Sequence, residues 1–296
     1  MRPINYEAIT AMKKCIQENM VTGKTCLTLR SITEETGVPF QTVGRYIQQF
    51  IDRGEIATDD EYGYVLTEMA GKINRVRQNM MNISTRSLFD SPHPLISEYE
   101  FPWEATEKLS ENIIALGRTL GNDYYSPKEN IWIHRTAKIS ESAEIVAPCI
   151  IESGAEIRHC AYIRGSVYVG ANAVIGNSSE VKNSILSERA CLPHFNYAGD
   201  SVIGRGAHLG AGAVISNLRL DKASVTVSDG NEKIATGMRK FGAAVGDGTE
   251  VGCGAVICPG SIIGKGCIIY PLALVRGCVD ENSVYKSVDC VNERRL

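Results

Sequence analysis

Three side chains in the second half of the sequence suit one chemical task. His194 opens the segment His-Phe-Asn-Tyr-Ala-Gly-Asp (194–200), and Arg164 and Lys182 precede it. Histidine exchanges a proton near neutral pH, so His194 is a candidate general base. Arginine offers a planar fork of donors and lysine a point charge, and both suit a phosphate group. The residue types indicate proton transfer beside a bound phosphate.

These side chains lie on a repeat with a period of six residues. Large aliphatic residues recur at this spacing, and a small residue follows most of them four positions later. A period of six with frequent glycine predicts short strands and tight turns stacked as the coils of a parallel β-solenoid. Residues 131–278 hold 20 of the 28 glycines, as expected if glycine occupies the turns. The aliphatic positions are Ile133, Ile139, Ile145, Ile151, Ile157, Ile163, Val169, Ile175, Val181, Ile203, Leu209, Ile215, Val245, Val251, Ile257, Ile263, Ile269 and Val275.

The repeat is interrupted twice. One interruption covers Ser187–Asp200 and contains His194, and the other is an excursion from Ser216 to Ala244. A regular solenoid has no need of a bulge, so we interpret both as functional loops. The alternative is a tolerated surface insertion, which costs little free energy.

The repeat resembles the hexapeptide-repeat acyltransferases, whose motif is [LIV]-[GAED]-x-x-[STAV]-x. This resemblance implies a left-handed parallel β-helix that assembles as a homotrimer. The order of His194, Tyr197, Gly199 and Asp200 further resembles the acetyltransferase domain of bifunctional enzymes that make UDP-N-acetylglucosamine, and the excursion resembles archaeal relatives of these enzymes. The resemblance assigns His194 as the catalytic base, and its substrate positions are Arg164, Lys182, Tyr197, Asn196, His208 and Asn217.

The implied co-substrate is acetyl-CoA. By the same resemblance it runs along the outside of the last coils, near Ala211, Cys253, Tyr270 and Pro271, with Lys265 and Arg276 available for its phosphates. Transfer to an amine needs a neutral nitrogen, so His194 would accept the amine proton, and backbone N–H groups would stabilise the oxyanion. Cys253 as a covalent nucleophile is an alternative, although direct transfer needs none.

Two positions depart from the bacterial pattern. His208 stands where that family has asparagine, and Leu218 stands where it has tyrosine, so the acceptor sugar need not be glucosamine 1-phosphate. His208 is also an alternative base. Residues 1–130 contain neither the Gly-rich loop nor the length of a nucleotide-binding domain, so we expect the pyrophosphorylase (uridyltransferase) half to be absent.

A zinc site is a further alternative, since the γ-class carbonic anhydrases use the same solenoid with three histidines. The candidates are His159, His194 and His208. That family places two of its ligands five residues apart, and no pair of these histidines has this spacing. We therefore expect no metal in the chemistry.

The first part of the chain has a different pattern. Helical spacing at 4–20, 29–36 and 40–53, a turn at Gly37-Val38-Pro39 and a hairpin at 56–67 resemble a winged helix-turn-helix domain, with Gln41, Thr42, Arg45 and Gln48 on the outer face of its recognition helix. Residues 1–86 carry 11 basic and 10 acidic side chains. DNA affinity comes largely from phosphate neutralisation, so nucleic acid is a possible partner, and protein interaction or stabilisation of the trimer is favoured.

The expected organisation is an α+β multidomain chain. It comprises the winged helix at 1–86, a helical connector at 87–130 that caps the open first coil, the solenoid at 131–280 with its loop at 216–244, and a tail at 281–296. The start of the sequence lacks an apolar signal region, and no apolar run is long enough for a membrane helix, so we expect a cytoplasmic protein without a membrane partner. The ten cysteines lack a C-x-x-C pair and are expected to be free thiols in small core positions.

The sequence thus predicts an acetyl-CoA-dependent N-acetyltransferase acting on an amino-sugar phosphate or a nucleotide-linked amino sugar. The rival hypothesis from another class is a regulator that senses a sugar nucleotide without converting it. The presence of His194, Tyr197, Arg164 and Lys182 favours the enzyme. The appended domain, together with His208 and Leu218, favours the regulator.

Overall fold

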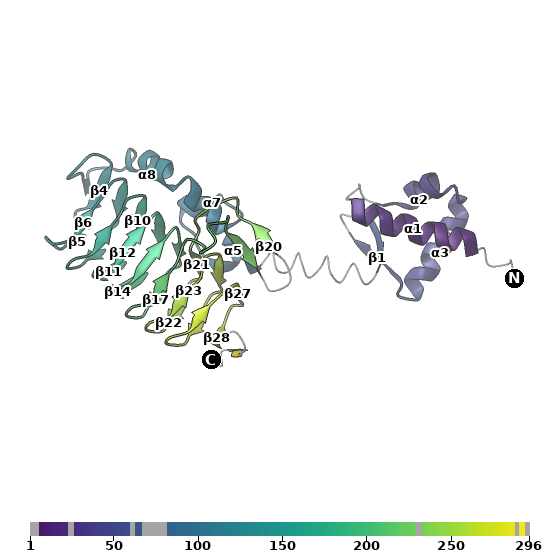
Figure 1. Cartoon of the computed structure of the whole chain (residues 1–296). Helices are drawn as coiled ribbons and strands as arrows, with labels where there is room; N and C mark the ends of the chain where they lie inside the picture. The colour runs from purple at the N-terminus through teal and green to yellow at the C-terminus, as the bar shows by residue number, and fades with distance from the viewer. Residues whose placement is uncertain are drawn as a thin grey trace. The chain divides into compact units, whose positions relative to one another are not determined.

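The computed structural model describes residues 6–22, 27–59, 63–66, 82–228, 233–287 and 290–293. Contacts divide the chain into two compact units, Met1–Asn79 and Met80–Leu296 (Figure 1). Each unit has a hydrophobic core of its own.

In the first unit, the described residues form three helices followed by a two-stranded antiparallel sheet. The elements are α1 (Tyr6–Thr22), α2 (Leu29–Thr36), α3 (Phe40–Asp52), β1 (Ile56–Asp59) and β2 (Gly63–Leu66). A capping box between Thr28 and Ser31 begins α2, and Gly37 ends it in the left-handed conformation. Val43 and Ile47 of α3 are buried, whereas Gln41, Arg45 and Gln48 are exposed and Thr42 is half-buried. The elements occupy the expected segments; residues 60–62 and 67 of the expected hairpin lie outside the described residues.

The second unit is a β-solenoid, left-handed β-helix-like, whose coils each contribute a strand to three parallel sheets. We call these sheets faces 1, 2 and 3, in the order in which each coil visits them. Face 1 contains β4 (Ile131–His134), β7 (Cys149–Ile151), β10 (Val167–Val169), β13 (Ser184–Leu186), β16 (Val202–Ile203), β21 (Ala243–Val245), β24 (Ser261–Ile263) and β27 (Cys278–Val279).

Faces 2 and 3 complete each coil. Face 2 contains β5 (Lys138–Ile139), β8 (Glu156–Ile157), β11 (Val174–Asn177), β14 (Cys191–His194), β17 (His208–Leu209), β22 (Glu250–Val251), β25 (Ile268–Ile269) and β28 (Ser283–Ser287). Face 3 contains β6 (Glu144–Ile145), β9 (Tyr162–Ile163), β12 (Glu180–Lys182), β15 (Tyr197–Gly199), β18 (Val214–Ile215), β23 (Val256–Ile257) and β26 (Leu274–Val275). We name each edge by the two faces that meet there.

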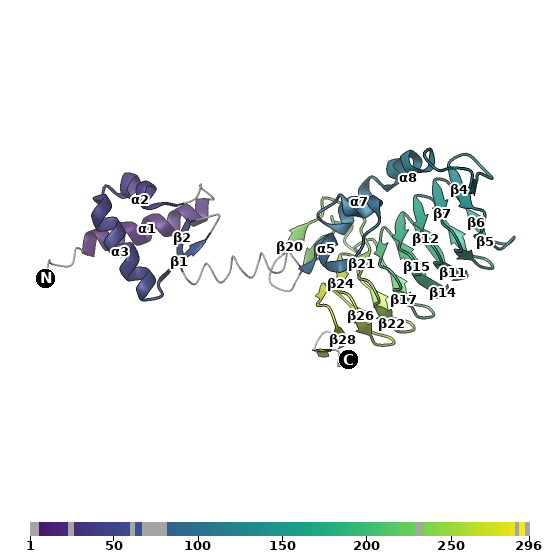
Figure 2. The same cartoon turned by 180° about the vertical axis from the view of Figure 1, so that it is seen from behind.

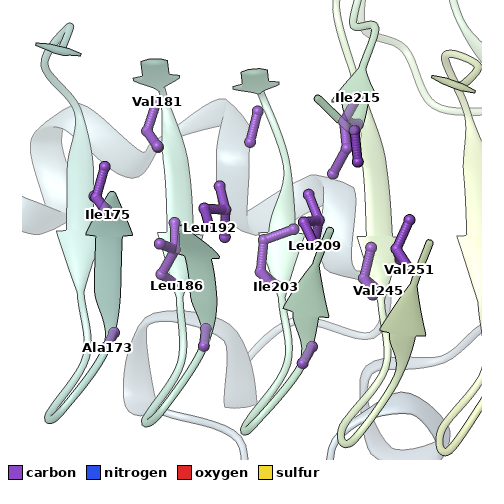
Figure 3. Packing of buried hydrophobic residues seen from close by; sticks show 14 of the residues in the cluster. Ala173, Ile175, Val181, Leu186, Leu192, Ile203, Leu209, Ile215, Val245 and Val251 are labelled. Atoms are coloured by element: carbon purple, nitrogen blue, oxygen red, sulfur yellow. The ribbon is translucent and has the colours of Figure 1, made fainter. Parts of the chain in front are cut away.

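The aliphatic positions of the six-residue repeat form the interior of this solenoid. Ile175, Leu192 and Leu209 stack in successive coils on face 2, and their side chains point inward with those of the other faces (Figure 3). Small residues such as Ala173 and Ala207 alternate with them and are fully buried. The interior admits small thiols too, since Cys149 and Cys267 belong to this core. Each coil therefore buries a narrow, closely packed set of side chains, as the sequence predicts.

The first interruption of the repeat is not a loop, contrary to our interpretation. Strands β14 and β15 run through Ser187–Asp200 and pair in register with their neighbours. The repeat shifts because two successive coils are one residue shorter than the regular coil: Val167 pairs with Cys149, 18 positions earlier, whereas Ser184 pairs with Val167 and Val202 with Ile185, both 17 positions apart. Both coils are one residue shorter at edge 3–1. There a single corner residue follows the strand of face 3, Asn183 in one coil and Asp200 in the next.

The second interruption is an excursion, as expected. The chain leaves face 3 after β18 and returns at β21, and between them β19 (Thr226–Ser228) and β20 (Lys233–Ala235) form an antiparallel pair. Val225, Val227 and Phe241 of this segment are buried against face 1. The excursion therefore packs on face 1 of the solenoid, while Asn217 near its start stays beside Asp200 at the end of face 3.

The helices of the second unit lie along face 1 and not over the open first coil, which corrects part of the expectation for 87–130. In the same segment β3 (Tyr124–Tyr125) does pair with β4 of the first coil. The helices are α5 (Thr85–Leu88), α6 (Pro94–Ser97), α7 (Pro102–Glu107) and α8 (Leu109–Gly117). In Figures 1 and 2, α8 lies over β7 and β10 and α7 lies over β16 and β21. Trp103, Leu109 and Ile113 bury outward-facing residues of face 1, such as Tyr168 and Ile185.

Both ends of the solenoid differ from the expected boundaries. Residues 82–86, expected in the first domain, pack with the second unit, where Thr85 and Leu88 are buried. The strand β3 (Tyr124–Tyr125) pairs antiparallel with β4 at one end. At the other end β28, expected to be part of a tail, extends face 2, and β29 (Cys290–Glu293) pairs antiparallel with it. Among the described helices, none is long and apolar enough to cross a bilayer.

Candidate active site

The two predicted phosphate ligands lie on edge 3–1, one coil apart. Arg164 follows β9 and Lys182 ends β12, and these strands pair in register. Neighbouring strands are about 4.8 Å apart, so one phosphate can reach both cations. Each cation has a carboxylate partner: Arg164 Nη1 donates to Glu180 Oε1 at 2.6 Å, and Lys182 Nζ donates to Asp200 Oδ1 at 3.2 Å. Glu180 raises the pKa of Arg164 through this hydrogen bond.

Asp200 organises the next positions on the same edge. It is 4% exposed and accepts hydrogen bonds from Lys182, from Asn183 Nδ2 at 2.8 Å and from Asn217 Nδ2. Asn183, Asp200 and Asn217 follow one another at intervals of 17 residues, so they stack as a ladder in consecutive coils. Asn183 and Asp200 adopt left-handed φ values of 46° and 49°, a conformation that asparagine and aspartate tolerate better than most residues. The buried carboxylate of Asp200 therefore holds the side chains of both Lys182 and Asn217 in place.

Tyr197 begins β15 and completes this cluster. Burial raises the pKa of its phenol, and the nearby Asp200 adds to the effect, so the hydroxyl stays protonated as a donor. Gly199 leaves the space that this arrangement needs, because a Cβ there would lie 2.6 Å from the Tyr197 hydroxyl oxygen and 2.5 Å from Asn217 Nδ2. Tyr197, Asn217 and Lys182 thus gather around one glycine, and the cations and the tyrosine come together as predicted from the sequence.

His194 lies at the other side of face 3, on edge 2–3, at the end of β14. Its side chain is exposed and makes no hydrogen bond or ion pair with the residues that the structure describes. Its backbone is held firmly: the N–H donates to Asn196 Oδ1 at 3.1 Å, and the carbonyl accepts from Gly212 N at 3.0 Å. The imidazole is accessible for a proton from a substrate, and the structure shows no direct contact between it and Tyr197 or Lys182.

Asn196 does not face a substrate, which corrects its assignment. It is 2% exposed and occupies one of the small interior positions of the repeat. Its amide donates to the carbonyls of Gly210 at 2.8 Å and Ala213 at 3.3 Å, and its Oδ1 receives the His194 N–H. Asn196 is therefore a positioning residue that ties the turn bearing His194 to the next coil.

His208 lies on face 2, away from the cluster on face 3 of the same chain. Its Nδ1 lies 2.9 Å from Glu250 Oε2 in the following coil. This partner restrains the ring, and the structure does not bring His208 together with Asn217. Leu218, the other departure from the family pattern, bridges to Lys240 at the base of the excursion.

The predicted coenzyme positions divide among three edges. Ala211, Cys253 and Pro271 stack directly above His194 on edge 2–3, because the Gly254 N–H donates to the Ala211 carbonyl and the Leu272 N–H to the Cys253 carbonyl. Tyr270 on this edge is 43% exposed. Arg276 lies on edge 3–1, in line with Arg164 and Lys182.

Lys265 lies on edge 1–2 and is not beside the other coenzyme positions, which corrects the prediction. Its Nζ donates to Asp90 Oδ1 at 2.7 Å, and this contact raises the pKa of the ammonium. Lys265 ties the segment before α6 to the solenoid, so it is not free for a phosphate on edge 2–3.

The roles of Glu180, Asn183 and Asp200 were missed from the sequence. Asp200 stood within the recognised motif, but its type and position gave no sign that it would be buried and bind three side chains. The signal that could have found it is the 17-residue spacing of Asn183, Asp200 and Asn217, each two positions after an inward-facing residue. In the described ranges no group of three or more histidine, cysteine, aspartate or glutamate side chains could hold a metal ion.

Comparisons with known proteins agree with the solenoid. The family model of the GMPPB C-terminal domain matches residues 145–232. The chain is 34% identical over 189 residues to a bifunctional sugar-1-phosphate nucleotidylyltransferase/acetyltransferase of Sulfurisphaera tokodaii, covering 62% of this chain and 47% of that protein. It is 35% identical over 193 residues to the bifunctional protein GlmU of Methanococcus vannielii, covering 59% of this chain and 46% of that protein.

Solved structures with a similar trace include the acetyltransferase domain of PglB from Neisseria gonorrhoeae in complex with acetyl coenzyme A. The identity is 15%, the TM-score is 0.21, and the match covers 63% of this chain and 64% of that one. PerB from Caulobacter crescentus, in complex with CoA and GDP-perosamine, matches at 16% identity and a TM-score of 0.19 over 51% of each chain.

The chain spans about half the length of the curated relatives it matches, and the matched part is C-terminal in this chain. The aligned region contains the solenoid, with the acetyltransferase fold. This chain is thus a homologue of GlmU-like bifunctional nucleotidyltransferase/acetyltransferases, and its second unit is a β-solenoid resembling those of the hexapeptide acetyltransferases.

Proposed function

We propose that the solenoid is an acetyl-CoA-dependent N-acetyltransferase that acts on an amino-sugar phosphate or a nucleotide-linked amino sugar. The observation that carries the proposal is the arrangement of face 3. On one edge Arg164 and Lys182 lie one coil apart and the Tyr197 hydroxyl lies beside Gly199, and on the other edge lies the imidazole of His194. The named functions of the homologous bifunctional proteins support it. A phosphate of the acceptor would bind Arg164 in place of Glu180 and would contact Lys182, which keeps its buried partner Asp200.

The proposed reaction uses His194 as the general base. The nitrogen of the neutral amine forms a bond to the thioester carbonyl carbon, and His194 accepts the proton that this nitrogen loses. The carbon–sulfur bond then breaks, and the thiolate of CoA leaves with the proton from the imidazolium. Backbone N–H groups on edge 2–3 would stabilise the oxyanion. Acetyl-CoA would lie along the row of His194, Ala211, Cys253 and Pro271, which is continuous on this edge.

The assembly proposed for this enzyme is a homotrimer. Face 1 is covered by helices and by the excursion, whereas face 3 carries Tyr162, Val256 and Leu274 at 41, 40 and 50% exposure in one outward row. Contact between copies would remove these apolar side chains from water. Such contact would also bring face 2 residues of one copy, including His208, toward face 3 of another.

A panel of acceptors tests the proposed substrate class. Release of CoA thiol from acetyl-CoA is measured with amino-sugar 1-phosphates, with the corresponding free amino sugars and with nucleotide-linked amino sugars. The proposal expects turnover with at least one phosphate-bearing acceptor and little with the free sugars. It also expects that Lys182→Met raises KM for the phosphate-bearing acceptor more than tenfold, since one charge-assisted hydrogen bond contributes about 1.5–3 kcal/mol. Equal turnover of phosphorylated and free sugars would contradict it.

The competing proposal is a non-catalytic regulator whose first unit binds DNA or protein as a winged helix. The exposed Gln41, Arg45 and Gln48 on α3, which follows the helix α2 and a three-residue connection, favour such a binding face. Absence of thiol release with every acceptor, together with a salt-sensitive shift of labelled DNA, would favour this function over acetyl transfer.

A further inference from the structure

A second cluster of reactive side chains lies on edge 2–3 of the early coils, two coils before His194. Cys160 Sγ lies 3.2 Å from His159 Nε2, and His159 Nδ1 lies 2.6 Å from Ser142 Oγ. Ser142 Oγ in turn lies 3.0 Å from Ser140 Oγ. A thiol, an imidazole and two hydroxyls thus form one continuous chain, and none of them belongs to the acetyl-transfer site.

The hydrogen bonds of this chain fit an imidazolium beside a thiolate. Ser142 Oγ accepts the Cys160 backbone N–H at 3.1 Å, so one of its two lone pairs is used. If His159 takes the thiol proton, Nδ1–H donates to the second lone pair of Ser142, and the Ser142 hydroxyl donates to Ser140. Nε2–H then donates to the thiolate sulfur. Every polar hydrogen between these groups has an acceptor both before and after the proton transfer, so the transfer leaves no donor unpaired.

The backbone holds the thiol and the imidazole in this arrangement. Cys160 has a left-handed φ of 54°, in a turn where later coils have Gly212 and Gly254. The His159 carbonyl accepts Asn177 Nδ2 at 3.2 Å and the Ser178 N–H at 3.3 Å, which fixes the turn to the next coil. His159, Cys160 and Ser142 are all exposed. The thiol is therefore accessible as well as restrained.

Cys253 provides a contrast within the same molecule. It is the other exposed cysteine in the described ranges, and it lies in a turn on the same edge, between Gly252 and Gly254. Its thiol has no side-chain partner in the part of the chain described by the structure. The two exposed thiols lie in turns on the same edge. They differ in the neighbouring imidazole and in position, because the left-handed position of Cys160 is taken by Gly254 in the coil of Cys253.

We propose that Cys160 is a histidine-activated thiol that is modified reversibly by small disulfides. His159 accepts the thiol proton, and the thiolate attacks one sulfur of R–S–S–R. A bond forms between Cys160 Sγ and that sulfur, the original S–S bond breaks, and RS⁻ leaves with the proton from the imidazolium. The cysteine is oxidised to a mixed disulfide, and the other half of the small disulfide is reduced to a thiol.

The surface beside the thiol favours a disulfide that carries carboxylates. A shallow depression of about 350 Å³ adjoins His159 and is lined by Lys138 and Arg158, among others. Both cations contact Glu156, and the three side chains together leave one positive charge. Oxidised glutathione, whose carboxylates suit these cations, is the probe for the test.

The test compares Cys160 with Cys253 in the full-length protein. The reduced protein is pulsed with oxidised glutathione at pH 6, 7 and 8, quenched with acid and digested, and the mixed disulfide at each cysteine is quantified by mass spectrometry. An ordinary thiol has a pKa near 8.5, so its rate falls about tenfold per pH unit below that value. We expect Cys160 to react at least tenfold faster than Cys253 at pH 7, with a smaller fall between pH 7 and pH 6.

Two variants separate activation by His159 from simple accessibility. In His159→Gln the rate at Cys160 should fall to that of Cys253 and regain the steep pH dependence, whereas His134→Gln, which changes a half-buried histidine elsewhere in the solenoid, should leave the rate at Cys160 unchanged. Equal rates at the two cysteines in the wild type, or no change in His159→Gln, would overturn the proposal. A parallel pulse with iodoacetamide tests the ligand class: rapid alkylation of Cys160 without rapid glutathionylation would refute small disulfides as its partners.

Discussion

At the scale of single residues, the candidate site depends on Asp200 more than on any cation. This buried carboxylate binds Lys182, Asn183 and Asn217 at once, and through them it defines edge 3–1 beside Tyr197. By contrast, the pair of Arg164 and Glu180 is partly exposed at both side chains. The buried pair of Lys182 and Asp200 is therefore part of the structure, whereas in the pair of Arg164 and Glu180 a substrate phosphate can replace the carboxylate.

Asp200→Ala is expected to lower the free energy of unfolding by about 2–3 kcal/mol, because it leaves Lys182 and two amides without their acceptor. Glu180→Gln breaks the partly exposed pair and is the matched control, with an expected loss of about 0.5 kcal/mol or less. Urea unfolding of both variants provides the measurement. Similar losses for the two would show that Asp200 does not organise the edge.

Gly199→Ala tests the space shared by Tyr197 and Asn217. The added Cβ would meet both polar groups at 2.6 Å or less, so we expect acetyl transfer to fall at least tenfold, the rate equivalent of about 1.4 kcal/mol. Gly121→Ala is the control, since its Cβ would meet nothing within 4 Å. Steady-state CoA release measures both variants, and normal activity in Gly199→Ala would remove this cluster from the mechanism.

Residue types together with the family resemblance pointed to part of this candidate site. Arg164, Lys182, Tyr197 and Asn217 were predicted from the sequence, and the structure brings them to one region of face 3. Asn196 was misassigned because an amide that satisfies interior carbonyls has the same sequence signal as an amide that binds a sugar. Burial distinguishes the two, and burial depends on the phase of the repeat at that position.

At the scale of elements, the strands could be predicted because the inward-facing positions of a solenoid recur with strict spacing. The nature of the first interruption could not, since the loss of one residue and the insertion of a loop both break the period. The structure shows two shortened corners, at Asn183 and Asp200, and these corners are part of the candidate site. The position of α7 and α8 over face 1 was also missed, because a short amphipathic helix does not indicate which apolar surface it covers.

The short helix α6 is expected to make the second unit sensitive to acid. His93 caps it, with Nδ1 accepting the Leu95 N–H at 3.2 Å, and its ring lies 4.2 Å from the ring of Tyr168. Burial lowers the pKa of His93 below its ordinary 6.5, and nearby Glu152 opposes the shift. The unfolded chain then binds this proton more readily than the folded one, so the free energy of unfolding should decrease as the pH falls through and below about 6.5.

His93→Asn keeps a side-chain cap without a titrating ring. We expect this variant to lose the part of the pH dependence that lies just below pH 6.5, as measured by urea unfolding between pH 7.5 and pH 5.5. His134→Asn, at a half-buried position of β4, is the control and should retain the wild-type slope. Parallel pH profiles for the wild type and His93→Asn would contradict this account.

At the scale of the whole molecule, the change from helical spacing in the first part of the chain to a six-residue repeat in the second predicted two kinds of structure. The structure has two units, and Leu88 and Trp103 belong to the core of the second one. The boundary was misplaced because residues 82–117 have an ordinary helical composition, and only the apolar surface of face 1 shows where they pack. Assembly is not encoded in a periodic pattern, so the homotrimer follows from the resemblance and from the bare face 3.

The proposed trimer predicts a sedimentation mass three times the chain mass of 32.2 kDa. Val256→Glu would place a charge in the apolar row of face 3, so we expect it to shift the protein toward smaller species at micromolar concentration. Tyr125→Glu changes a residue of similar exposure on β3. It is the control and should keep the sedimentation mass of the wild type. A monomeric wild-type protein would contradict the proposed assembly.

The most direct test of the central claim is the rate of CoA release by His194→Ala with an amino-sugar phosphate that the wild type acetylates. We predict a loss of at least 100-fold in kcat, the size expected for a general base, with unfolding midpoint and sedimentation unchanged. His208→Ala, measured in parallel, is predicted to retain most of the activity. Undiminished turnover in His194→Ala, or a larger loss in His208→Ala, would contradict the account.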